Sequence, residues 1–201
     1  MTAASGGARP SSSKGSLRRL ARIEEATRQL LREHESTEVS VADIADLAEV
    51  SVATIYNLVG PRDRILASVL NGYVTRLAAN LTDRPPTTGV LATAVSVYMA
   101  AVDEALSDPL PLRAVLRELG PLNLQQTKGA GVDDVIVPLL CAQGAAEDQA
   151  REAARLINYA FRGMIVSWAH GLISDARFRA DTELAASRIA QATLSTADDD
   201  A

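Results

Sequence analysis

Apolar residues recur every three or four positions along most of the chain, and no stretch alternates between apolar and polar residues as a strand would. The first such pattern follows Ser16, a suitable N-cap, and ends near His34, which predicts a helix over residues 17–34. The longest pattern covers residues 148–172, and a shorter one covers 181–195. The pattern therefore predicts an all-α fold of roughly nine helices.

Two short segments with helical patterns follow each other with only a few residues between them. Ser40 precedes VADIADLA and Ser51 precedes VATIYN, and serine is a good N-cap in both places. Only Glu49 and Val50 separate the two segments, so the two helices must cross steeply. The small side chain of Ala45 allows them to pack closely. This is the geometry of a helix-turn-helix, in which the second helix can enter the major groove of DNA.

Such a helix pair cannot bury its own core, so neighbouring helices must complete the domain. We expect a disordered basic arm over residues 1–16 and a three-helix DNA-binding domain over 17–64. A second, larger helical domain is expected over 65–196, with a helix at 62–81 as the connector. Residues 197–201 read as a frayed tail.

Charge is distributed unevenly along the chain, whose net charge is −5. Residues 1–64 carry nine Lys or Arg and nine Asp or Glu, whereas residues 65–201 carry eleven and sixteen. The segment from Arg9 to Arg22 contains no acidic residue and five cations, which are Arg9, Lys14, Arg18, Arg19 and Arg22. This run is either a solvated tail or an arm that contacts DNA.

The stretch SVADIADLAEVSVATIYNLVGPRDRIL, residues 40–66, resembles the DNA-binding domain of TetR-type transcriptional regulators. Glu49 replaces the usual turn glycine, at a cost of about 1 kcal/mol if that residue is left-handed. Leu58 and Val59 replace a frequent His-Phe pair. The matching residues are Asp43, Ile44, Ala45, Val50, Ser51, Thr54, Tyr56, Ile65 and Leu66, with Arg62 in place of a common lysine.

The resemblance implies a set of DNA contacts. Tyr56 and Arg62 are expected to bind phosphates, while Thr54 and Asn57 read bases, since asparagine suits adenine and a methyl group suits thymine. The alternative for each is an ordinary role, at the edge of the core for Tyr56 and on a solvated helix surface for the others. The full predicted set is Lys14, Arg18, Arg19, Ser40, Ser51, Val52, Ala53, Thr54, Tyr56, Asn57 and Arg62.

For the second domain, the resemblance implies binding of a small-molecule effector and a homodimer through 148–172 and 181–195. The dimer would bind a palindromic double-stranded operator as a repressor, and the effector would release it. The candidate walls of the effector cavity combine apolar bulk with a few polar tips, which favours a mostly apolar molecule. They are Tyr98, Val102, Leu116, Asn158, Phe161, Met164 and Trp168.

Other chemistry is sparse in the sequence. His34 and His170 lie in no metal-ligand spacing, Cys141 has no cysteine partner, and no catalytic motif occurs, so we predict no metal, no cofactor and no enzyme activity. The chain shows no signal peptide and no 18-residue apolar run, which favours a cytoplasmic protein without membrane contact. The alternative function is an all-α small-molecule carrier or interaction protein with a DNA-reading head that has lost function, as Glu49, Val52 and Leu58 would allow.

Overall fold

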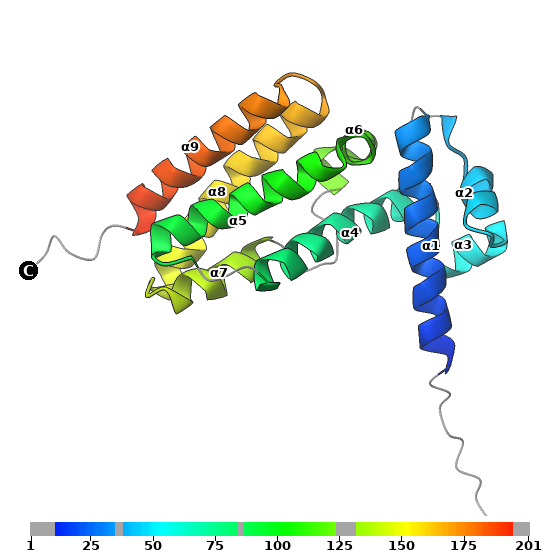
Figure 1. Cartoon of the computed structure of the whole chain (residues 1–201), viewed down its shortest axis with the longest axis horizontal. Helices are drawn as coiled ribbons and strands as arrows, with labels where there is room; N and C mark the ends of the chain where they lie inside the picture. The colour runs from blue at the N-terminus through cyan, green and yellow to red at the C-terminus, as the bar shows by residue number, and fades with distance from the viewer. Residues whose placement is uncertain (1–10, 35–37, 84–86, 124–131, 195–201) are drawn as a thin grey trace, which may run out of the picture. The chain divides into compact units, whose positions relative to one another are not determined.

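The computed structural model describes residues 11–34, 38–83, 87–123 and 132–194. These residues contain nine helices and no strand, so the predicted all-α fold is confirmed (Figure 1). The helices are α1 (Ser11–Glu33), α2 (Val41–Leu47), α3 (Val52–Leu58), α4 (Arg62–Asp83), α5 (Val90–Ser107), α6 (Pro109–Asn123), α7 (Val132–Ala142), α8 (Glu147–Ala169) and α9 (Asp175–Leu194). The chain divides into two compact units, Met1–Val69 (unit 1) and Leu70–Ala201 (unit 2).

Unit 1 forms around one apolar stripe of α1, which lies against both α2 and α3. Ile23 of α1, Ile44 of α2 and Ile55 of α3 are all buried to within 1% of full burial. Ile65 completes this core from the first part of α4, and Ser68 of α4 donates a hydrogen bond to the Glu24 carboxylate. Each such aliphatic side chain stabilises the fold by about 1.5–3 kcal/mol, so no short helix of this unit is stable alone.

Unit 2 is a bundle in which α9 packs along both α5 and α8. Alanines at the contacts, including Ala94, Ala153 and Ala186, are fully buried and allow the helices to approach closely. An aromatic cluster fills the centre of the bundle, and its ring centroids are separated by 5.6 Å (Tyr98–Phe161), 5.8 Å (Phe161–Phe178) and 5.3 Å (Trp168–Phe178).

Helix α5 is the one helix, among the residues described, that is long and apolar enough to cross a membrane by length and composition. One face of it is buried in the bundle. Its last turns also carry two carboxylates in ion pairs, Asp103 with Arg179 at 2.6 Å and Glu104 with Arg76 at 2.7 Å. These features identify α5 as the core helix of unit 2.

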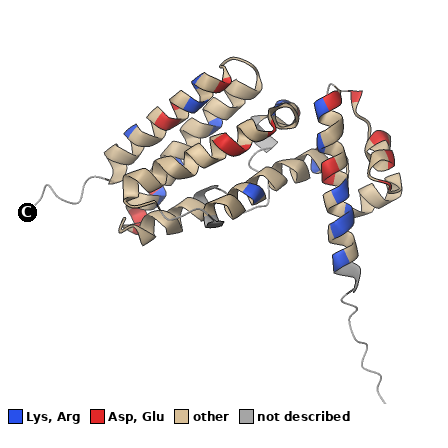
Figure 2. Ribbon diagram, in the orientation of Figure 1, with Lys and Arg blue, Asp and Glu red and all other residues tan. Residues whose placement is uncertain are grey.

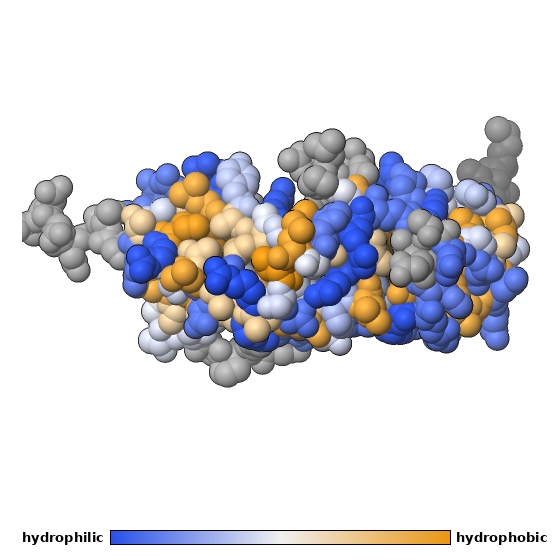
Figure 3. All heavy atoms as spheres, turned by 90° about the horizontal axis from the view of Figure 1, so that it is seen from above, coloured by the Kyte–Doolittle hydropathy of each residue, from blue (hydrophilic) through white to orange (hydrophobic). Residues whose placement is uncertain are grey.

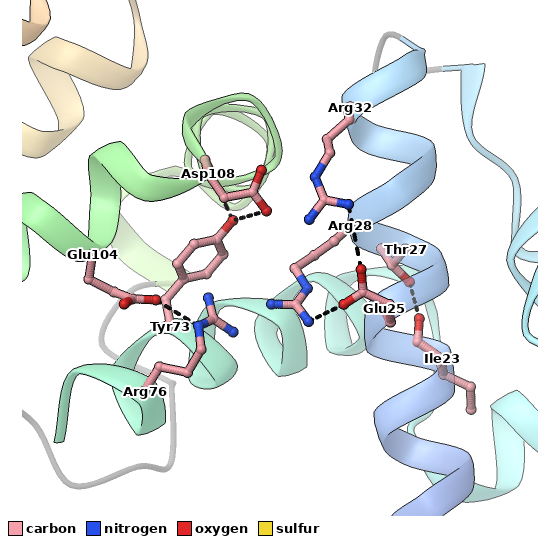
Figure 4. A network of polar contacts seen from close by, with 9 residues as sticks. All are labelled: Ile23, Glu25, Thr27, Arg28, Arg32, Tyr73, Arg76, Glu104 and Asp108. Carbon is pink, nitrogen blue, oxygen red and sulfur yellow. Dashed lines mark hydrogen bonds and ion pairs between the residues drawn. The ribbon is translucent and has the colours of Figure 1, made fainter. Parts of the chain in front are cut away.

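Figure 4 shows polar contacts inside each unit, those of α4 in unit 2 and those of α1 in unit 1. In unit 2, the Tyr73 hydroxyl donates to the Asp108 backbone carbonyl at 3.0 Å, and Arg76 lies over the Tyr73 ring at 4.4 Å. In unit 1, the α1 residue Glu25 accepts hydrogen bonds from Arg28 and Arg32. Helix α4 belongs to both units, because the boundary falls between Val69 and Leu70 rather than at residue 64.

Three predicted boundaries are corrected. Helix α1 begins at Ser11, so residues 11–16 are not part of a disordered arm, because an established helix gains one hydrogen bond for each residue added. Helix α9 begins at Asp175 rather than at 181. At this start, the Ser174 hydroxyl accepts a hydrogen bond from the Arg177 backbone N–H at 3.2 Å. Helix α8 ends at Ala169 rather than at residue 172, since His170 is its C-cap and Gly171 has a φ of 74°.

Some predictions concern residues outside those described. They are the basic residue Arg9, the rest of the expected arm over residues 1–10, and the frayed tail at 197–201.

Candidate nucleic-acid interface

Helix α2 begins with a reciprocal hydrogen-bonded cap. The Asp43 backbone N–H donates to Ser40 Oγ at 3.2 Å, while Asp43 Oδ2 accepts from the Ser40 backbone N–H at 2.8 Å and from Ser40 Oγ at 2.6 Å. These hydrogen bonds from Ser40 favour the ionised carboxylate and lower the pKa of Asp43 below its ordinary value of 3.8. The cap therefore fixes the start of the first helix of the helix-turn-helix.

The turn between α2 and α3 contains a left-handed residue. Glu49 has φ 49°, the one positive φ at a non-glycine among the described residues. This turn is held from outside by Arg22 of α1, which donates to the backbone carbonyls of Ala48 and, at 2.9 Å, Glu49. Arg22 also pairs with the Glu49 carboxylate at 3.3 Å.

The sequence indicated Arg22 only as a member of the basic run that begins at Arg9. The long-range contact could not be read from the sequence, although a glutamate in place of the turn glycine was a signal that the turn needed support. The left-handed conformation on which the predicted cost of Glu49 depended is present.

Helix α3 is capped by Ser51, whose Oγ accepts from the Thr54 backbone N–H at 3.1 Å and lies 2.8 Å from Thr54 Oγ1. The Thr54 side chain is half-buried and its hydroxyl is engaged with the cap. Of the two predicted base-reading residues, only Asn57 is therefore fully on the exposed side.

One face of α3 is exposed to solvent within unit 1. Tyr56 is 53% exposed and Val52 is 40% exposed, and Ala53 and Asn57 lie beside them. Ile55 points the other way and is fully buried. The spacing of one and four residues places all four exposed side chains on a single face, which is the arrangement needed to contact a groove.

Cations lie on α1 rather than on α3. Figure 2 shows Lys and Arg along α1 and neither acid nor base on α3. Lys14, Arg18 and Arg19 of α1 are exposed. Arg62 is half-buried at the start of α4, where it donates a hydrogen bond to the Val39 carbonyl. It fastens the segment before α2 to α4, a role that the sequence did not indicate.

The whole chain was compared with known proteins. No family model matches it, and no curated protein matches it in sequence. The crystal structure of a TetR transcriptional regulator from Rhodococcus sp. RHA1 matches with a TM-score of 0.68 over 85% of this chain and 94% of that chain, at 21% sequence identity. The chain has the TetR-type fold. The fold that the helix-turn-helix stretch implied is thus confirmed.

Within this TetR-type fold, six of the seven residues predicted to line an effector cavity lie in the core of unit 2. Tyr98, Val102 and Trp168 have no exposed surface, and the Tyr98 hydroxyl donates to the Ala154 carbonyl at 3.1 Å. Leu116, Asn158 and Phe161 are also buried, while Met164 is half-buried and accepts a hydrogen bond from Thr182 at 3.9 Å. Phe178, which the sequence did not single out, stacks on Trp168 and completes this cluster.

An open pocket of about 340 Å³ lies elsewhere in unit 2, between α5 and α9. None of the seven predicted residues lines it; its walls are Leu91, Ala92, Val95, Ser96, Ser187 and Gln191. Among the residues described, no group of three or more His, Cys, Asp or Glu side chains could hold a metal ion.

Proposed function

We propose that this protein is a DNA-binding transcriptional regulator that acts as a repressor and is released from a palindromic operator by a small, mostly apolar effector. The observation that carries the proposal is the exposed face of α3. A seven-residue helix is held by a serine cap, a clamped turn and one buried isoleucine, and it presents four side chains that nothing in unit 1 covers.

The mode of binding follows from the helix-turn-helix. Helix α3 lies in the major groove, and Tyr56 donates its hydroxyl to a backbone phosphate. Lys14, Arg18 and Arg19 are exposed on α1 and supply the positive charge that α3 lacks. In this reading phosphate contacts provide most of the affinity, and the face of α3 provides the sequence preference.

Homodimerisation is supported by apolar side chains that unit 2 leaves exposed. Tyr159 of α8 is 61% exposed and Leu184 of α9 is 55% exposed. Hydrophobic and hydrophilic residues alternate on the surface seen from above, over the part of unit 2 that contains α9 (Figure 3). Two copies that pair through α8 and α9 would bury these residues in a four-helix interface. The dimer would then have two helix-turn-helix units for DNA binding.

The effector response would act through unit 2 and α4. The aromatic cluster is apolar, and its few polar tips, Tyr98 and Asn158, match a ligand with one or two hydrogen-bonding groups. Tyr73 and Arg76 attach the second part of α4 to Asp108 and Glu104. A ligand that displaces these contacts would change the position of α4. We place such a regulator in the cytoplasm and assign it no catalytic activity.

Binding of the full-length protein to duplexes from the region upstream of its own gene tests the proposal. The expected result is saturable binding whose log K falls linearly with log salt concentration, with a slope of about −0.9 for each phosphate contacted. A carrier or interaction protein would bind no duplex, or would bind every duplex equally. Leu110→Ala, in α6 and 56% exposed, is the matched surface control and should leave binding unchanged.

A further inference from the structure

The exposed face of α3 has an unusual chemical composition for a surface that reads bases. Val52 and Ala53 present aliphatic groups, Tyr56 an aromatic ring and Asn57 an amide. None of the seven residues of α3 is charged. Val52 is 40% exposed, which makes it one of the larger apolar side chains that unit 1 leaves in solvent.

Each base pair offers a distinct edge in the major groove. Guanine offers two acceptors that are best matched by arginine or lysine, adenine offers a donor and an acceptor that are matched by asparagine, and thymine offers a methyl group. Helix α3 contains no arginine or lysine, and the Thr54 hydroxyl is engaged with Ser51 at 2.8 Å. The groups that remain match thymine and adenine and leave guanine without a partner.

We propose that α3 reads its half-site through thymine methyl groups packed against Val52 and Ala53 and through one adenine held by Asn57. The inference rests on the proposed function, since it assumes that α3 enters the major groove. It adds the chemical class of the target, which is a half-site with A·T pairs at the positions facing α3.

Selectivity in such a face has two sources. A thymine methyl group and the Val52 side chain remove each other from water, which contributes favourable free energy in proportion to the apolar area covered. Opposite guanine or cytosine, the same side chain would cover a polar base edge without offering it a hydrogen bond, which is unfavourable. The discrimination therefore needs no charged side chain.

The local structure holds these side chains in place. Val52 and Ala53 follow directly after the Ser51 cap, and residues at the start of a recognition helix are the ones that reach base edges. Ile55 anchors the helix from behind, and Arg22 fixes the turn that precedes it. A short apolar side chain can contribute to specificity only when its position is fixed to this degree.

The experiment starts with selection of duplexes from a random-sequence pool by the full-length protein. The bound duplex is then remade with deoxyuridine in place of thymidine at the half-site positions, which removes only the methyl groups. We expect the dissociation constant to rise about fourfold for each contacted methyl group lost. The same replacement outside the half-sites is the matched control and should have no effect.

Val52→Ala links the methyl effect to this residue. On the thymidine duplex the variant should bind severalfold more weakly than the original protein. On the deoxyuridine duplex the two proteins should bind nearly alike, because the methyl groups that Val52 contacts are already gone. Val52 is partly exposed, so the variant should fold, and its thermal midpoint is measured beside that of Leu110→Ala, which should match the original protein on both duplexes.

Each outcome decides the inference. An A·T-rich selected half-site, a loss on deoxyuridine replacement and its disappearance in Val52→Ala support it. A selected half-site with guanines at the contacted positions, or binding indifferent to deoxyuridine, overturns it while the proposed function stands. If no duplex is enriched, both fail.

Discussion

Glu49 occupies a left-handed backbone conformation that residues other than glycine usually avoid. A left-handed residue with a Cβ costs about 1 kcal/mol relative to glycine. Arg22 offsets this cost, because its guanidinium donates to the carbonyls of Ala48 and Glu49 and also pairs with the glutamate. Glu49 and Arg22 therefore act together in this turn.

Arg22→Ala should lower the free energy of unfolding by about 1–2 kcal/mol, because two turn carbonyls lose a charged donor. Glu49→Gly should be neutral or stabilising by up to about 1 kcal/mol, since relief of the left-handed cost exceeds the loss of an exposed ion pair. Urea unfolding followed by circular dichroism measures both. Arg151→Ala, which breaks an exposed pair with Glu147 and no backbone contact, is the control and should have a small effect. An Arg22→Ala variant no less stable than this control would contradict the clamp.

Tyr56→Phe removes one hydroxyl from a side chain that is 53% exposed. If that hydroxyl binds a phosphate, affinity should fall by a similar factor on every duplex, because phosphate contacts carry no sequence information. Asn57→Ala is the comparison variant, and its loss should be larger on the preferred duplex than on others. If both variants lose affinity by the same factor on every duplex, the assignment of Tyr56 to a phosphate and Asn57 to a base is contradicted.

Arg62→Ala is a less direct test of phosphate binding than the sequence suggested. The side chain donates to the Val39 carbonyl, so its removal should lower the stability of unit 1 as well as DNA affinity. Only a change in the salt slope of about one per site would indicate a phosphate contact. A stability loss with an unchanged slope would leave Arg62 a structural residue.

At the scale of elements, patterns confined to one helix were predicted well. The end of α1 at Glu33, the serine caps of α2 and α3, and the long apolar face of α8 all follow from residues within four positions of each other. The start of α9 was missed because the segment DARFRAD holds a single large apolar residue, Phe178. That same residue completes the aromatic cluster, so the filling of the core was missed with it.

Contacts between distant elements could not be predicted. The distance in sequence from Arg22 to Glu49 is 27 residues and from Arg62 to Val39 it is 23, and no periodic pattern spans such separations. The arginines look alike in the sequence, yet Arg18 and Arg19 are exposed while Arg22 and Arg62 bind backbone carbonyls. Only the folded positions of α1 and α4 beside the helix-turn-helix distinguish them.

Helix α2 has seven residues and depends on its cap. Because the pKa of Asp43 is lowered in the folded protein, the cap contributes stability above the ordinary carboxyl value of 3.8 and loses it as pH falls through the lowered pKa. Asp43→Asn should therefore be less stable than the original protein at neutral pH, and the difference should shrink in strong acid. Unfolding measured from pH 7 downward checks this. Asp46→Asn, on the same helix but outside the cap, should show no comparable difference at neutral pH, and a constant Asp43→Asn difference at all pH values would contradict the role of the carboxylate.

At the scale of the whole molecule, the proposed homodimer would cover exposed apolar side chains of α8 and α9. Leu184→Arg should shift a homodimer toward monomer, because a charge in the interface loses solvation without gaining a partner. Leu110→Arg is closely matched, since the two leucines are 55% and 56% exposed, and it should leave the dimer intact. Sedimentation at micromolar concentration distinguishes the two. A monomeric original protein, or equal behaviour of both variants, would exclude this interface.

The proposed effector response also concerns the whole molecule. Six of the seven predicted wall residues are buried, so a ligand that enters this core must separate side chains and shift helices. Tyr73 and Arg76 attach α4 to Asp108 and Glu104, so such a shift would reach the helix that continues into unit 1.

To convert a population of DNA-binding to non-binding forms from 99:1 to 1:99, the ligand must favour the second form by about 5.5 kcal/mol. Linkage then requires that operator DNA weaken ligand binding by the same factor by which ligand weakens DNA binding. A ligand that co-purifies with the protein, identified by mass spectrometry, is titrated with and without saturating operator. Its affinity should be weaker in the presence of DNA, and the ratio should equal the loss of DNA affinity measured independently. Equal ligand affinities in the two titrations would exclude release by that ligand, even if the protein binds DNA, because a ligand without preference for either form cannot shift their equilibrium.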